Sequence, residues 1–74
     1  RSSRMEPIRD IDQHVICKVD AYRGLVESVT KKGTIRIILP LGGEIEFINE
    51  RTYTVIRRER TELFYVNSIH LMTG

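Results

Sequence analysis

Cysteine is nearly absent from this chain of 74 residues, and tryptophan is absent altogether. Cys17 is the single cysteine, so no intramolecular disulfide can form and no CxxC motif exists to bind zinc. A lone thiol on an apolar strand is typical of a buried structural cysteine in a reducing compartment. We therefore expect a cytoplasmic protein with no metal site and no cofactor.

Long apolar runs and a strong charge of one sign are also lacking. No stretch approaches the ~20 apolar residues of a membrane span, and the start of the chain lacks a signal-peptide pattern. Twelve Lys and Arg against ten Asp and Glu give a net charge of +2, which is small for a protein that binds duplex DNA by neutralising phosphates. These absences predict a soluble intracellular chain that does not enter a membrane.

The sequence does contain apolar and polar residues that alternate with a period of two, interrupted by turn residues at short intervals. This pattern predicts antiparallel strands with one buried face. Residues 58–61 lack Gly, Pro and Asn, so a turn, a helical turn and one continuous long strand all remain open there. The expected strands cover residues 14–19, 25–30, 34–39, 44–48, 53–57 and 62–66, and residues 69–72 form a closing segment.

The length of the chain allows one hydrophobic core and excludes two. We predict a single all-β domain of five or six antiparallel strands over residues 14–74, preceded by an amino-terminal arm over residues 1–13. Residues 1–4 look like an expression remnant ahead of a natural start at Met5. In the first strand Val15, Cys17 and Val19 form the expected core face, and in the strand over residues 34–39 the expected core residues are Ile35, Ile37 and Leu39.

Three local patterns follow one another in a familiar order. Gly24-x-Val26 leads into a hairpin, Gly33 precedes a β-branched strand, and Tyr65-Val66-x-x-Ile69 closes the chain. This order of elements resembles the SH3-like and Sm-like group of small barrels. The resemblance implies a strongly bent antiparallel sheet that closes into a barrel, and it implies no particular function.

Residues that could support catalysis are present but are not suitably arranged. On a regular strand His14 and Cys17 point to opposite faces, so they do not pair as a base and a nucleophile. Glu44 and Glu46 share a face, but it is the solvent side of a hairpin strand, where charges discourage pairing between molecules. The two glycines before Glu44 open a strand rather than a helix, so they form no phosphate loop. We therefore predict no catalytic residues, no small-molecule substrate and no enzymatic activity.

Arginine dominates the cations, with nine of the twelve, and its planar guanidinium binds phosphates and stacks on aromatic rings. Small barrels bind single-stranded nucleic acid through such cations and through exposed aromatic side chains, which here would be Tyr22, Tyr53 and Phe64. The mixed charges over residues 58–62 equally suit a solvated hairpin tip. We expect a regulatory binding module that contacts nucleic acid, single-stranded rather than duplex, or a protein of the nucleic-acid machinery. The predicted contact residues are Lys31, Lys32, Arg36, Arg57, Arg58 and Arg60.

Three isoleucines fall on strand faces that are expected to point outward. If they lie together, they form an exposed apolar patch of the kind that marks a protein interface. An equally good interpretation is that the amino-terminal arm covers them through Ile8 and Ile11. The alternative function is thus protein interaction or homodimerisation, through this patch or an exposed strand edge, which would also support a small core. The three residues are Ile38, Ile48 and Ile56.

Overall fold

The computed structural model describes residues 5–71, which form strands joined by turns and short loops. The strands are β1 (Glu6–Arg9), β2 (Val15–Asp20), β3 (Leu25–Thr30), β4 (Gly33–Ile38), β5 (Glu44–Ile48), β6 (Thr52–Arg60) and β7 (Leu63–His70). They make a four-stranded sheet in the order β1-β2-β3-β4 and a three-stranded sheet in the order β5-β6-β7. Every paired strand is antiparallel to its neighbour, so the predicted all-β antiparallel class is confirmed.

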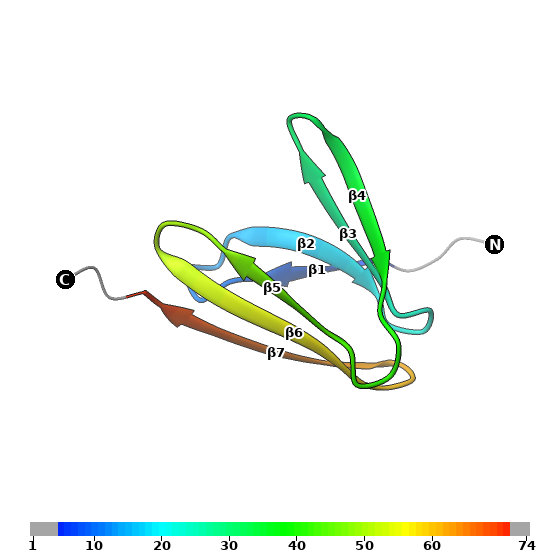
Figure 1. The fold of residues 1–74 in the computed structure, drawn as a ribbon. Coiled ribbons are helices and arrows are strands. Elements are labelled where there is room, and N and C mark those ends of the chain that lie inside the picture. Colours follow the sequence, from blue (N-terminus) through cyan, green and yellow to red (C-terminus); the bar gives the residue numbers. More distant parts are fainter. Residues whose placement is uncertain (1–4, 72–74) are drawn as a thin grey trace.

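The two sheets are arranged so that only part of the first one packs against the second. In Figure 1, β1 and β2 run alongside the second sheet, whereas the β3–β4 hairpin rises away from it. Over residues 5–71 no strand of one sheet pairs with a strand of the other, and no closed barrel is formed. The observed architecture is therefore a pair of antiparallel sheets rather than the closed barrel that the resemblance implied.

Three stretches differ from the predicted strand pattern. Residues 6–9, expected in an arm outside the domain, pair with β2 as strand β1, and Pro7 is tolerated there because β1 is an edge strand. Residues 58–61 are divided between strand and turn: β6 runs to Arg60, and a turn follows in which Glu62 has a φ of 74°, so one continuous strand through this stretch is wrong. β7 continues through residues 67–68, where a break was expected. Seven strands thus replace the expected five or six, and the prediction for residues 1–4 lies outside the described residues.

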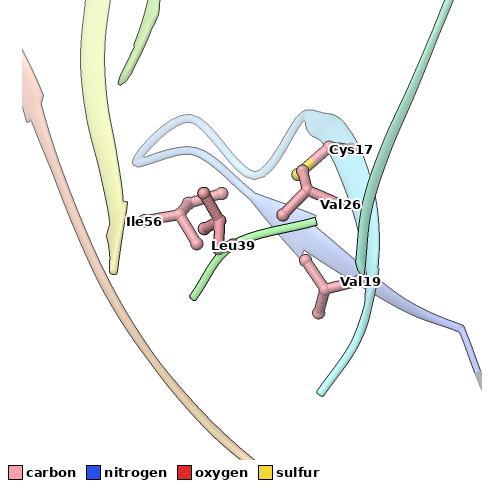
Figure 2. Close-up of a cluster of buried hydrophobic side chains, with 5 residues drawn as sticks. All are labelled: Cys17, Val19, Val26, Leu39 and Ile56. Atoms are coloured by element: carbon pink, nitrogen blue, oxygen red, sulfur yellow. The ribbon is translucent and has the colours of Figure 1, made fainter. Parts of the chain in front are cut away.

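A small core lies between the sheets. Figure 2 shows its buried apolar side chains, which come from β2, β3, β6 and the residue after β4: Cys17, Val19, Val26, Leu39 and Ile56. The predicted burial of Cys17 is confirmed, since it is 4% exposed. Burial also raises the pKa of the Cys17 thiol to about 11, because the thiolate would have to form away from water.

The face of β6 that was expected to point outward packs against the core. The prediction of an outward Ile56 is wrong, because Ile56, Thr52 and Thr54 are all at most 1% exposed. The two threonines are tolerated inside because their hydroxyls have partners. Thr52 Oγ1 donates to a carboxylate oxygen of Asp10 over 3.5 Å, and Thr54 Oγ1 lies 2.9 Å from a serine hydroxyl of β7. These nonlocal hydrogen bonds fix which face of β6 is buried.

Candidate interaction surfaces

The predicted basic residues do not gather on one face. Lys31 and Lys32 form the turn between β3 and β4, whereas Arg60 ends β6 beside the turn to β7. Figure 1 shows these two turns at different ends of the molecule. Cations at such separate places do not follow one nucleic-acid backbone as a continuous stripe would.

Arg57 lies on the outer face of the second sheet and is already neutralised by neighbours. Its Nε donates to the Glu59 carboxylate over 2.6 Å, and its Nη1 lies 3.4 Å from a carboxylate oxygen of Glu44. The guanidinium also stacks over the ring of Tyr65, 4.7 Å from the centroid. The hydrogen bond to Glu59 raises the pKa of Arg57. Arg57 would have to give up these partners in order to bind a phosphate.

Arg58 points inward and joins the two sheets. Its Nη1 donates to the carbonyl oxygen of Leu39 over 2.9 Å, and its Nη2 donates to that of Tyr22 over 3.2 Å. Gly24 leaves the room for this contact, since a Cβ atom there would lie 2.5 Å from Arg58 Nη1. Arg58 thus acts as a clamp between β6 and the first sheet. Its inward direction follows from strand alternation once Ile56, two residues earlier, is known to be buried.

The aromatic residues proposed as a stacking platform are also separated. Tyr22 is 68% exposed, but Phe64 packs against the core. Tyr53 is half-buried and donates its hydroxyl to the Glu46 carboxylate over 2.5 Å, which raises the pKa of Tyr53. Only Tyr22 of the three is therefore free to stack on a base.

The most exposed apolar surface belongs to the β3–β4 hairpin, in which every residue of β4 is exposed. On one face Ile37 lies opposite the buried Val26 at the base, and Ile35 lies further out opposite Ser28. Both isoleucines are on the expected core side, yet they are 37% and 54% exposed because the hairpin extends beyond the second sheet. The other face presents Ile38, which is 71% exposed, and Val29, which is 73% exposed. We call Val29, Ile35, Ile37 and Ile38 the hairpin surface.

Ile48 does not belong to this surface. It is 66% exposed on the outer face of the second sheet, where it lies opposite Tyr53, which in turn pairs with Ile69. Ile38 lies on the first sheet, and Ile56 is in the core. The three isoleucines predicted as one interface are therefore in three different environments.

A polar cluster that the sequence analysis missed fixes the loop between β1 and β2. One carboxylate oxygen of Asp10, which is 3% exposed, accepts the backbone N–H groups of Asp12 and His14, each over 2.9 Å. Asp12 in turn contacts Nε2 of His70 on β7 over 2.6 Å, and this hydrogen bond lowers the pKa of Asp12. An aspartate that binds backbone N–H groups two and four residues later is a recognisable turn signal. The described residues contain no group of His, Cys, Asp or Glu side chains arranged to hold a metal ion.

The comparisons with known proteins leave function to be inferred from the molecule itself. Neither protein-family models, nor curated proteins, nor solved structures give a match to this chain. Within the described range there is also no helix with the length and apolar character needed to cross a membrane. The hairpin surface is thus the main structural feature on which a function can be argued.

Proposed function

We propose that this chain is a non-enzymatic protein-interaction module of the cytoplasm, and that its contact site is the hairpin surface. The observation that carries the proposal is that every residue of β4 is exposed, in a strand that contains three isoleucines in six residues. A monomeric soluble protein seldom leaves so many large apolar side chains of one hairpin in water. The cytoplasmic location is supported by the free, buried Cys17.

The energy available from this surface is moderate. Complete burial of an isoleucine or valine side chain stabilises a complex by about 1.5–3 kcal/mol, and the hairpin residues are between 37% and 73% exposed. Their burial therefore offers roughly 3–7 kcal/mol, against an association cost of about 4–15 kcal/mol. Side-chain burial alone falls near or below this cost, so a partner would also have to use the backbone hydrogen-bonding groups of β4.

Photo-crosslinking tests the proposal directly. A photoreactive amino acid replaces Ile38 in the protein expressed in its own cells, and a matched control places it at Thr61, an exposed residue of the β6–β7 turn. We expect crosslinks to protein from position 38 and few from position 61. Equal and low crosslinking from both positions would contradict an interaction role for the hairpin.

Nucleic-acid binding is a second proposal, and the β3–β4 turn is the feature that supports it. Among the described residues no ion pair engages Lys31 or Lys32, so both ammonium groups are available to an anion. Titration with a short single-stranded oligonucleotide should then shift the amide resonances of residues 30–34, and added salt should reverse the shifts. A variant with both lysines replaced by alanine should show no shifts, and persistent shifts in that variant would contradict the proposal.

The relation to SH3-like and Sm-like barrels belongs with these proposals. We propose that the two sheets are an open relative of that arrangement. The support is the run of consecutive antiparallel strands, with a hairpin between Gly24 and Leu39. Many barrels of this shape act by binding, which agrees with the role proposed for the hairpin surface, but fold alone does not select the partner.

A further inference from the structure

Two of the four edge strands in the described residues, β1 and β5, carry features that discourage pairing with another molecule. β1 contains Pro7 and a register shift after Ile8. β5 carries Glu44 and Glu46 on its outer face. Prolines, bulges and charges of this kind are how natural sheets protect their edges.

β4 also lacks such protection, and among the described edge strands it is the one in which every residue is exposed. Its register with β3 is regular from Gly33 to Ile38, and the strand contains no proline. Arg36 is its single charged residue, and the guanidinium is held by Glu27 of β3 through a hydrogen bond of 2.8 Å. The charge is therefore directed to the neighbouring strand rather than to the open edge.

The direction of the backbone groups on β4 follows from one hydrogen bond. The N–H of Leu39 donates to the carbonyl oxygen of Gly24 over 2.8 Å, so the backbone of Leu39 faces the side of β3. Because alternate residues of an antiparallel strand face opposite sides, Ile37 and Ile35 also bond to β3. Thr34, Arg36 and Ile38 direct their N–H and C=O groups to the open edge, where no described strand pairs with them.

The sequence of β4 is complementary to itself in an antiparallel arrangement. With a twofold axis at Arg36, Ile35 lies opposite Ile37 of the second copy on the apolar face. Thr34 lies opposite Ile38 of the second copy, and the facing residues can exchange backbone hydrogen bonds. The two Arg36 side chains meet, but each brings the Glu27 carboxylate that it already binds, so the contact carries no net charge.

We propose that the partner of the hairpin surface is a second copy of this chain, which pairs β4 with β4 across the open edge. The inference rests on the protein-interaction role proposed above and names its partner. The charges and the apolar residues of β4 match those of a second β4 strand, and this match favours a second copy of the chain over an unrelated strand. The described residues also include fourteen exposed large apolar side chains but only five buried ones, so a twofold contact would supply the support that one core lacks.

Two matched substitutions at Ile38 test the pairing. Ile38→Pro removes an N–H that faces the open edge and leaves the bonds to β3 in place, whereas Ile38→Thr keeps this N–H and is also β-branched. We expect sedimentation equilibrium to show a dimer of the unaltered protein. The dissociation constant of the Ile38→Pro dimer should be at least about tenfold higher than that of the Ile38→Thr dimer, because the twofold axis removes the same hydrogen bond from both copies. Equal amide protection of Val26 and Ile56 in both variants would show that the fold is retained.

Hydrogen exchange of the unaltered protein gives a second test that needs no variant. Raising the protein concentration should slow exchange at the amides of Thr34, Arg36 and Ile38 by a much larger factor than at Ile35 and Ile37. A dimer in which the exchange rates of these amides do not alternate along β4 would overturn the pairing. A dimer whose dissociation constant is unchanged by Ile38→Pro would overturn it as well.

The two proposals can fail separately. A protein that stays monomeric up to about 1 mM, yet crosslinks through position 38 to a different protein, overturns self-pairing and leaves the interaction role intact. A monomer with no crosslinks from position 38 overturns both.

Discussion

Replacing Arg58 by alanine tests whether one guanidinium holds the two sheets together. Its hydrogen bonds to the carbonyl oxygens of Leu39 and Tyr22 are 2.9 Å and 3.2 Å long. A hydrogen bond to a charged group contributes about 1.5–3 kcal/mol, and the longer and more exposed of these two counts for less. We therefore expect the free energy of unfolding to fall by about 2–4 kcal/mol. A chain of this size has roughly 3–5 kcal/mol in total, so much of the variant would be unfolded.

Urea unfolding followed by circular dichroism, at one fixed protein concentration, measures this change. The midpoint should move to lower urea with little change in slope. Arg60→Ala is the matched control, because Arg60 is exposed at the end of the same strand and should change stability by less than about 0.5 kcal/mol. The loss in the free energy of unfolding for Arg58→Lys should lie between the losses for these two variants, since lysine keeps the charge but lacks the planar pair of donors.

Gly24→Ala provides an independent check on the same contact. Gly24 has a φ of +73°, and a Cβ atom there would lie 2.5 Å from Arg58 Nη1. The substitution is destabilising alone, but part of its cost should disappear when Arg58 is also alanine. We expect the double variant to be more stable than additivity predicts, by at least about 0.5 kcal/mol. Additive effects, or an Arg58→Ala loss no larger than that of Arg60→Ala, would refute the clamp.

Three other predictions follow from burial and ionisation. Ile56→Ala should cost about 2–5 kcal/mol in urea unfolding, whereas Ile48→Ala should cost less than about 1 kcal/mol, and equal losses would contradict the face assigned to β6. Because the folded pKa of Asp12 lies below its ordinary value of 3.8, its contact with His70 stabilises the fold above that pH and this contribution is lost as the pH falls through the folded pKa. Asp12→Asn should therefore lower stability at about pH 6, and this loss should shrink as the pH falls below about 4, a trend that thermal unfolding would detect. Cys17, with a pKa of about 11, should react with iodoacetamide at neutral pH far more slowly than after unfolding in urea, and similar rates would contradict its burial.

Local patterns in the sequence were sufficient to predict β2, β3 and β4. Cys17 and Val19 are in the core as predicted, whereas Val15, expected on the same face, is 47% exposed. The hairpin turn between β3 and β4 lies at residues 31–32, as predicted from Gly33, which follows it. In these places local alternation and turn chemistry agree with the tertiary structure, so no distant contact was needed to choose between alternatives.

The face of β6 could not be predicted in this way. Tyr53 is on one side and Ile56 on the other, so hydrophobicity leaves either face suitable for burial. The choice depends on partners far away in the chain, including Asp10, which lies 42 residues from Thr52. The role of Arg58 is hidden for the same reason, since nothing local distinguishes it from Arg57 until one face of the strand is known to be inside.

The clamp and the open edge are linked through the stability of the chain. If β4 pairs with a second copy, dimerisation adds to folding by mass action, and the unfolding midpoint should rise with protein concentration. Above the dissociation constant, each tenfold increase in concentration should add about 1.4 kcal/mol per dimer. Ile38→Pro should abolish this dependence while Arg58→Ala keeps it at a lower midpoint, because Ile38 faces the edge and Arg58 acts within one chain. A midpoint that does not change with concentration in the unaltered protein would mean that the two sheets and the Arg58 clamp stabilise the monomer without help from the exposed strand.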